Sequence, residues 1–269
     1  MIINTETYRA LEQDVASICD CVEEFIYEKI SDFDSQCIDS PNPDWDRFYE
    51  LIDQFIDNNS DLNIVNEVYI YHLARHFNEP TELLPLRDLL LTKNPFSDFL
   101  AENEIVFKEN EQLNFYYKQH LVNPAHLLSS GHSLLAKRLG YLGDADFCIN
   151  GFTFWPDIEE TSYGYFRDLD FGPEIIRYIG QYIGIDLWRE YRKRTNYYGV
   201  VFKVPINEII FDGVDNITTK EDKVKYLLKN SLLTLHGCYF RCPSSTNNPI
   251  IRISDDSKAK VDHCILISS

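Results

Sequence analysis

The chain has 269 residues, of which 44% are hydrophobic and 25% are charged, and its formal net charge is −18. This composition is ordinary for a globular protein and excludes a disordered chain of low hydrophobicity. No apolar run approaches the roughly 20 residues that a membrane-spanning helix needs, so we expect no membrane partner. The first residues lack a basic region followed by an apolar stretch, so we expect no signal peptide and a cytoplasmic protein.

The negative charge is concentrated at the front of the chain. Residues 1–60 carry 15 Asp and Glu against three Lys and Arg, a net of −12. The net charge is −5 over residues 61–110 and −1 over residues 111–269. This asymmetry predicts two units, an acidic helical hairpin over 1–60 and an α+β domain over 61–269. It also disfavours nucleic acid as a partner, because phosphates are repelled by the overall charge.

The first 60 residues predict two amphipathic helices. Apolar residues recur at steps of three and four over residues 7–33, which predicts one helix. The PNPD stretch at 41–44 ends it, and Asp44 can cap a second helix whose apolar face runs from Trp45 to Ile56. The pair is either a solvated hairpin with a packed inner face or an electrostatic surface for a basic protein partner.

The segment 62–77 is ambiguous between strand and helix. Its apolar spacing permits a helix, whereas the aromatic and β-branched residues at 68–71 favour a strand.

Capping, turn and alternation signals predict the remaining elements. The first are a helix opened by Asn94-Pro95 and running to about 102, a β-hairpin over 104–122, and a helix over 132–139 ended by Gly140. A strand over 146–155, interrupted at Asn150-Gly151, is followed by helices over 172–183 and 185–194 and a strand over 197–205. A capping box from Thr218 to Glu221 then opens a helix that runs to about 235, and NPIIRIS and VDHCILIS are the two final strands. Since no sustained βαβ rhythm is present, we expect an α+β fold with a mixed, mainly antiparallel core and flanking helices.

Several chemistries are disfavoured by missing signatures. The sequence contains no GxxxxGK[ST], GxGxxG, HExxH or GxSxG, which argues against P-loop, Rossmann, zincin and α/β-hydrolase sites. The seven cysteines are expected as buried thiols, including Cys148, which could otherwise pair with His263 or His132 as a nucleophile. The cluster of His236, Cys238, Cys242, His263 and Cys264 fits zinc spacing poorly, so no metal is predicted.

Two segments mix aromatic and basic side chains. They are FYYKQH at 115–120 and WREYRKRTNYY at 188–198, and the second contains four positive charges against one negative over 189–194. Such a mixture can stack on single-stranded bases, and it can equally form the outer faces of a hairpin and a helix. Nucleic-acid contact through Arg192 and Arg194 is therefore an alternative.

The strands downstream of residue 68 follow a recognisable order. Val68-Tyr-Ile-Tyr71 is followed by His72, and Gly151-Phe-Thr-Phe154 is followed by PDIEETSYGY. Next come VVFKVP at 200–205 and a last strand around Asp262. This order resembles the ADP-ribosyltransferase superfamily, in the branch whose signature is His, Tyr and Glu on three strands.

The resemblance implies NAD as a bound substrate and a role for each matching residue. His72 would hold the nicotinamide-side ribose, Tyr163 or Tyr165 would stack on nicotinamide, and Asp262 or Glu208 would supply the acidic group. Breaking the glycosidic bond develops positive charge on the sugar, which an aromatic clamp and a nearby carboxylate stabilise. The family's glycine after the histidine is replaced by Leu73, and its final glutamate is missing.

Arg75 has two predicted roles. It could reach a pyrophosphate with its planar fork, or it could form a surface ion pair with Glu79 or Glu82. On the first view, Arg75 belongs with His72, Tyr163 and Tyr165 as an NAD-binding residue.

The sequence thus supports two functions. The first is an ADP-ribosyltransferase-like effector, of a toxin or defence type, that transfers ADP-ribose from NAD to a protein or nucleic acid. The alternative is a non-enzymatic acidic protein of an inhibitor, immunity or nucleic-acid-mimic type, which docks on a basic partner through residues 1–60.

Overall fold

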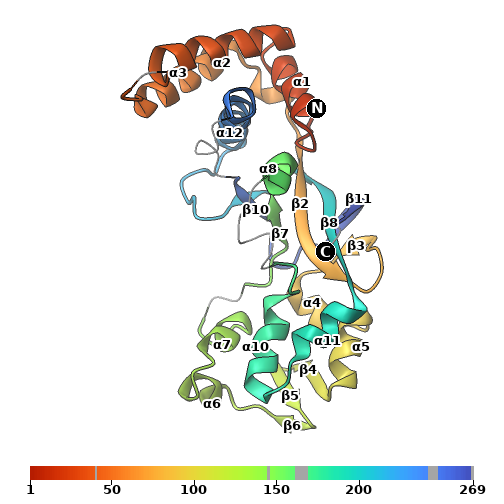
Figure 1. Cartoon of the computed structure of the whole chain (residues 1–269). Helices are drawn as coiled ribbons and strands as arrows, with labels where there is room; N and C mark the ends of the chain where they lie inside the picture. Colours follow the sequence, from red (N-terminus) through yellow and green to blue (C-terminus); the bar gives the residue numbers. More distant parts are fainter. Residues whose placement is uncertain (40, 144–145, 161–168, 242–247, 268–269) are drawn as a thin grey trace. The chain divides into compact units, whose positions relative to one another are not determined.

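The computed structural model describes residues 1–39, 41–143, 146–160, 169–241 and 248–267 (Figure 1). Helices and antiparallel sheets are mixed along the chain, so the predicted α+β class is confirmed. Among these residues, no helix is both long and apolar enough to cross a bilayer.

The chain divides into two compact units, each built from three stretches of sequence. The first unit comprises residues 1–71, 151–161 and 203–252, and the second comprises 72–150, 162–202 and 253–269. Residues 1–60, predicted as a hairpin of their own, therefore share a unit with later parts of the chain. The charge follows this division: the first unit carries 25 Asp and Glu against ten Lys and Arg, a net of −15, and the second a net of −3.

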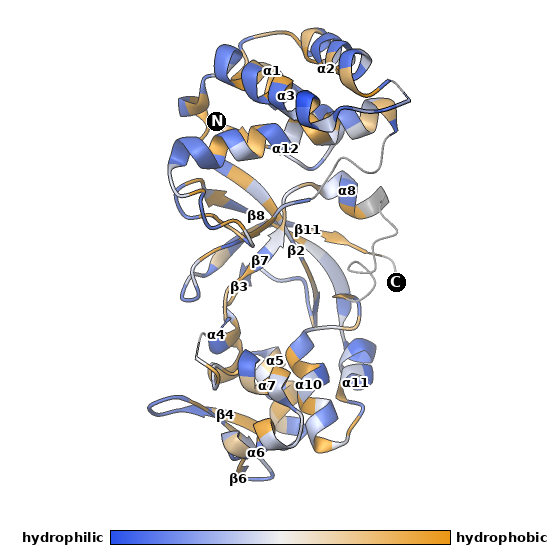
Figure 2. Cartoon of the chain, turned by 90° about the vertical axis from the view of Figure 1, so that its left-hand side faces the viewer, coloured by the Kyte–Doolittle hydropathy of each residue, from blue (hydrophilic) through white to orange (hydrophobic). Residues whose placement is uncertain are grey.

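Four helices form most of the first unit. They are α1 (Tyr8–Ile18), α2 (Glu23–Cys37), α3 (Trp45–Asn59) and α12 (Lys220–Phe240). Helix α12 packs against the other three (Figure 1). Hydrophilic and hydrophobic stripes alternate along α1, α2 and α3 (Figure 2). Smaller elements complete this unit: the 3₁₀ turn η1 (Leu62–Ile64), α8 (Trp155–Glu160), β1 (Ile2–Ile3), β9 (Ile210–Phe211) and β10 (Ile250–Arg252).

The single helix predicted over residues 7–33 is wrong. Helix α1 ends at Ile18, Asp20 adopts a left-handed conformation at φ 47°, and α2 begins at Glu23. The carbonyl of Ile18 accepts a hydrogen bond from the amide of Asp61 at 2.9 Å, so a later segment satisfies the helix end. Apolar spacing continues across the break, which is why periodicity alone could not reveal it.

The segment 62–77 is a strand over most of its length. Strand β2 (Glu67–His76) pairs with β1 in parallel and with β7 (Asn150–Phe152) in antiparallel fashion, with Tyr71 opposite Phe152. Buried and partly exposed residues alternate along β2, and this alternation shifts by one position at Tyr71. Val68 and Ile70 are buried before that point, and Leu73 and Arg75 after it. The change coincides with the boundary between the two units.

The second unit contains the rest of the sheet and a cluster of short helices. Strand β11 (Ala259–Leu266) lies between β3 (Glu82–Leu83) and β8 (Asn196–Pro205), with both pairings antiparallel. Strand β8 is also next to β2 in the sheet order, and each of these two strands contributes residues to both units. The helices are α4 (Leu86–Leu91), α5 (Pro95–Glu102), α6 (Pro124–Ser129), α7 (Ser133–Arg138), α10 (Glu174–Ile183) and α11 (Leu187–Arg194).

A separate three-stranded sheet confirms the predicted hairpin. It consists of β4 (Ile105–Glu109), β5 (Leu113–Tyr117) and β6 (His120–Leu121). Its inner side chains, among them Phe107 and Phe115, join the apolar core formed by α5, α10 and α11.

The capping predictions had mixed outcomes. Asn94 caps α5, since its Oδ1 accepts from the amides of Phe96 and Ser97, as predicted. In α12 the cap is Thr219 rather than Thr218, with Asp222 as its partner. This helix also continues to Phe240, well past the predicted end near residue 235.

Candidate functional site

His72 is held in one tautomer by the main chain. Its side chain is half-buried on β2, and its Nδ1 lies 2.6 Å from the carbonyl oxygen of Asn150. A carbonyl can only accept, so Nδ1 carries the proton and Nε2 is the acceptor atom of the ring. Burial lowers the pKa of His72, which keeps the imidazole neutral at pH 7. The site therefore offers a positioned, uncharged hydrogen-bond acceptor.

His76 lies on the same face of β2 as His72, because four residues separate them. Burial and the neighbouring His72 lower the pKa of His76 to about 3. Its Nε2 is buried and makes no hydrogen bond to any residue that the structure describes. Sequence reasoning missed this second histidine, although the HxxxH spacing on a strand was visible.

Arg75 lies on the opposite face of β2 and is 5% exposed. Its Nε donates to Oγ1 of Thr195 at 3.1 Å, Nη1 donates to Asp170, and Nη2 donates to the carbonyls of Arg192 and Thr195. All five N–H groups of the guanidinium are thus used within the second unit. The predicted pyrophosphate contact is therefore not supported, and the carboxylate that pairs with Arg75 is the half-buried Asp170 instead of the predicted Glu79 or Glu82.

The basic run on α11 is neutralised by its own protein. Arg189 pairs with Asp186, Arg192 with Asp170, Lys193 with Glu190, and Arg194 with Glu102. The prediction that Arg192 and Arg194 contact nucleic acid is not supported by this arrangement. The carboxylate of Asp170 pairs with both Arg75 and Arg192, so these two arginines stabilise the second unit.

The two predicted acidic residues lie in different units. Asp262 is on β11 in the second unit, at a register shift between Val261 and His263. Its Oδ2 is 3.3 Å from Nδ1 of His263. Glu208 belongs to the first unit and lies in the turn after β8, not on a strand. Its amide donates to the carbonyl of Pro205 at 2.9 Å.

The predicted nicotinamide-stacking residues, Tyr163 and Tyr165, lie outside the described residues. Of the site suggested by the resemblance, the second unit contains His72, Arg75 and Asp262 among its described residues. Strand β8 stands between β2 and β11 in the sheet order. Neighbouring strands are about 4.8 Å apart, so His72 and Asp262 sit on strands about 10 Å apart.

One group of described residues has metal-ligating atoms close together. Ligand atoms of Asp146, Cys148 and Asp255 all lie within 4.8 Å of one another in the second unit. These atoms already have protein partners, because Cys148 Sγ donates to Asp146, Arg138 pairs with Asp146, and Asp255 accepts from the amide of Phe147. Hydrogen bonds and an ion pair between separate segments of the second unit thus account for the group.

The histidines and cysteines whose spacing fits zinc poorly do not gather in one unit. His236 and Cys238 belong to the first unit, His263 and Cys264 to the second, and Cys242 lies outside the described residues. The ring of His236 is bonded to Asp34.

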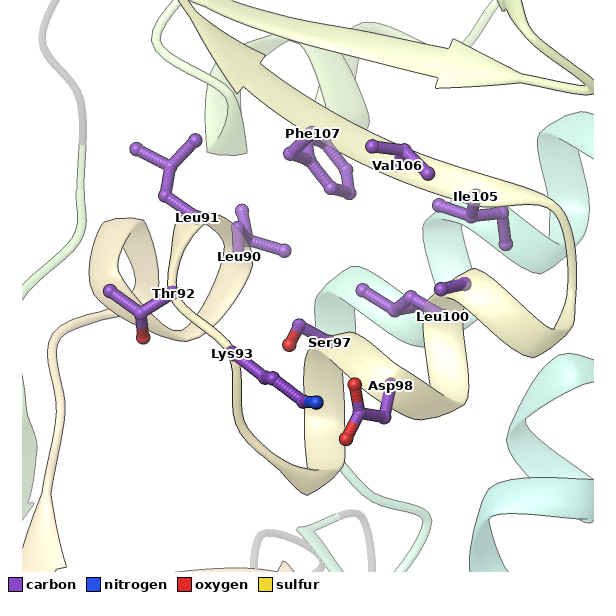
Figure 3. A pocket seen from close by; sticks show the side chains of 11 residues that line it. Leu90, Leu91, Thr92, Lys93, Ser97, Asp98, Leu100, Ile105, Val106 and Phe107 are labelled. Atoms are coloured by element: carbon purple, nitrogen blue, oxygen red, sulfur yellow. The ribbon is translucent and has the colours of Figure 1, made fainter.

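A pocket of about 250 Å³ lies between α4, α5 and β4 (Figure 3). Its floor is apolar, with Leu90, Leu100 and Phe107, and the side chains of Lys93 and Asp98 point toward one another at its edge (Figure 3). None of the predicted site residues lines it. Among the described residues, no buried side-chain nitrogen or oxygen that lines it lacks a hydrogen-bond partner.

The geometry of His72 is thus the most specific chemical feature among the predicted site residues. No protein-family model, curated protein or solved structure matches this chain.

Proposed function

We propose that this chain binds NAD and transfers ADP-ribose to a protein or nucleic acid, as an enzyme similar to ADP-ribosyltransferases. The observation that carries the proposal is the neutral imidazole of His72, fixed by Asn150 on the strand where the resemblance expects a ribose-binding histidine. An acceptor nitrogen that stays uncharged suits a ribose hydroxyl, which donates a hydrogen bond to it.

A close approach of strand β7 to β2 adds support. A Cβ at Gly151 would lie 2.6 Å from Cγ2 of Ile70 and 2.7 Å from the carbonyl oxygen of Tyr71. Only glycine fits there without movement of the backbone. This close packing explains why glycine is the first residue of the Gly151-Phe-Thr-Phe154 string, which the resemblance alone did not explain.

Asp262 is the better candidate for the acidic role. It belongs to the same unit as His72, whereas Glu208 belongs to the other unit. In the proposed reaction the bond between the nicotinamide nitrogen and the ribose breaks, nicotinamide leaves with the bonding electrons, and the acceptor attacks the sugar carbon. A carboxylate near that carbon stabilises its developing positive charge.

Proton NMR of the protein with NAD tests the proposal. We expect release of nicotinamide, or saturation transfer to the nicotinamide and adenine protons when an acceptor is missing. His72→Ala should abolish the signal that wild type gives, while the matched control His120→Ala, an exposed histidine on β6, should leave it unchanged. Wild-type protein that gives neither signal, or a His72→Ala variant that keeps it, contradicts the proposal.

The segregation of charge favours a second candidate function, which is docking on a basic protein. Exposed carboxylates on and beside α2 and α3 form no ion pair with any described cation; they include Asp20, Glu24, Glu28, Asp39 and Asp46. Asp53 and Asp57 are different, because they pair with Lys229 and Lys225 of α12.

Substitution tests the docking function better than deletion of residues 1–60. Deletion would expose the face of α12 that packs against α1, α2 and α3, so we expect it to destabilise the first unit. A triple variant, Glu24→Gln, Glu28→Gln and Asp46→Asn, removes charge at the surface only. We expect it to weaken binding of an oligolysine peptide and to flatten the salt dependence. A triple variant in the second unit, Glu82→Gln, Asp98→Asn and Glu111→Gln, is the control, and equal effects of the two variants contradict the docking function.

A further inference from the structure

A pocket of about 450 Å³ lies at the end of the second unit that contains β6 and α6. Both elements lie below α10 in the two views (Figures 1 and 2). Aromatic, imidazole and cationic side chains dominate its lining, namely Tyr117, Lys118, His120, His126 and Tyr182. The pocket belongs entirely to one unit and contains none of the residues assigned to NAD.

The turn between β5 and β6 exposes a cation at the edge of this pocket. Lys118 and Gln119 both adopt left-handed conformations, with φ of 50° and 65°. Two consecutive residues in this region form the tight turn that suits a twisted hairpin, although glycine or asparagine is the usual choice there. The ammonium of Lys118 lies 5.2 Å from the centre of the Tyr117 ring. Its nearest carboxylate, Glu104, is 3.9 Å away, and both side chains are more than half exposed, so this pair is weak.

The ring of Tyr182 is held in place by two histidines. Nδ1 of His126 lies 3.3 Å from the hydroxyl oxygen of Tyr182, and the ring of His132 meets the Tyr182 ring edge-on at 5.2 Å. Tyr182 comes from α10 and Tyr117 from β5, so two different elements each supply a tyrosine to the lining.

The stretch of sequence that supplies most of the pocket's lining contains no acidic residue. Residues 112–143 contain no Asp or Glu, although the whole chain has 43 of them. The same stretch contains Lys118, Lys137 and Arg138, together with three of the seven histidines. In a protein of net charge −18, this segment is a local exception that suits an anionic ligand with flat, stackable groups.

We propose that this pocket binds single-stranded nucleic acid, with one base stacked on the tyrosine and imidazole rings and a backbone phosphate beside Lys118. The chemistry fits because every base has a π-face and every phosphate is an anion, so stacking and charge attraction act together without sequence readout. The pocket is open, and most of its lining residues are half-buried or exposed, which suits a strand passing across it. This binding does not depend on NAD turnover.

Fluorescence anisotropy with a labelled oligothymidylate of ten nucleotides tests the proposal, with the full chain and without NAD. Replacing Tyr117 by Leu should weaken binding about 5- to 160-fold, since stacking contributes ~1–3 kcal/mol per base. Tyr117→Phe keeps the ring and should bind like wild type. Lys118→Gln should reduce the slope of log affinity against log salt by about 0.7, as one phosphate contact does on a single strand.

The same hairpin offers a matched control. Lys108 lies 5.2 Å from the ring of Tyr116, which is the same pairing of cation and tyrosine outside the pocket lining. Tyr116→Leu and Lys108→Gln should leave binding unchanged. Wild-type protein that does not bind the oligonucleotide, or equal losses in the pocket and control variants, overturns the proposal. Thymidine monophosphate that binds as tightly as the oligonucleotide overturns the single strand as the occupant.

Discussion

The Nε2 atom of His236 lies 2.7 Å from Oδ1 of Asp34, and this contact joins α12 to α2 inside the first unit. The imidazole is completely buried, with the rings of Trp45, Phe48 and Phe240 around it. Since carbonyls and carboxylates only accept, Nε2 donates the proton of this bond. A polar link between helices about 200 residues apart in the sequence thus lies within an apolar core.

Removal of Asp34 should therefore destabilise the first unit. Asp34→Ala leaves the buried Nε2 proton without an acceptor, which costs about 1–3 kcal/mol. Urea unfolding followed by circular dichroism measures the loss. Asp32→Ala on the same helix is the control, because Asp32 is 62% exposed and 3.9 Å from Lys29, so we expect a change below about 0.5 kcal/mol. Equal effects of the two substitutions would show that the buried contact contributes nothing.

Arg75 should behave as a structural residue that lysine cannot replace. Arg75→Lys keeps the charge but loses the fork that reaches Asp170, Thr195 and Arg192, so we expect about 1.5–3 kcal/mol of destabilisation from the lost hydrogen bonds. Arg194→Lys changes an exposed pair with Glu102 and should cost less than about 1 kcal/mol. A stable Arg75→Lys protein that had lost only its affinity for NAD would restore the pyrophosphate role.

Stability should fall in mild acid because of His76. Its pKa is about 3 in the folded protein and near 6.5 in the unfolded chain, so between these values the unfolded state binds more protons. The stabilisation is complete above pH 6.5 and is lost as the pH falls toward 3, with a slope of up to about 1.4 kcal/mol per pH unit from this group. Denaturant unfolding at pH 4–7 should show a smaller slope for His76→Gln than for wild type. His120→Gln, at an exposed position, should keep the wild-type slope.

Gly151→Ala should disturb the pairing of β7 with β2. The added methyl group would meet the backbone of Tyr71 at 2.7 Å, so the strands must separate. Overpacking of this kind costs about 1–3 kcal/mol. Asn150→Ala, one residue earlier and exposed, is the control for a change in the same strand. Thermal unfolding compares the two, and a Gly151→Ala protein as stable as Asn150→Ala would refute the close approach.

Elements that are stabilised by contacts between sequence neighbours were predicted well. The cap formed by Asn94 before Pro95 depends on neighbouring residues only, and it is present as predicted. Over 62–77 the composition at Val68–Tyr71 favoured a strand while the apolar spacing permitted a helix, and β2 resolves this ambiguity as a strand. The break after Ile18 was missed because its partner, Asp61, is more than 40 residues away in the sequence.

The candidate site was harder to predict because its partners are set by tertiary structure. Nothing near Arg75 in the sequence indicates that its guanidinium is bonded to Asp170, 95 residues later, and to Thr195 and Arg192. Likewise the tautomer of His72 depends on the main chain of Asn150. Residue type and strand position could be predicted from sequence, whereas protonation state and saturation of hydrogen bonds could not.

The composition of the first unit has a consequence for how the protein is made. Helices α1, α2 and α3 end at Asn59, but α12, against which they pack, begins only at Lys220. At synthesis rates of about 5–20 residues per second, the ribosome needs roughly 10–30 s to add the intervening chain. During that interval the apolar faces of the three helices lack their final neighbour, while the second unit is still missing β11. We expect their many carboxylates to keep nascent chains apart by mutual repulsion, so that the acidity of this unit lowers its tendency to aggregate during synthesis.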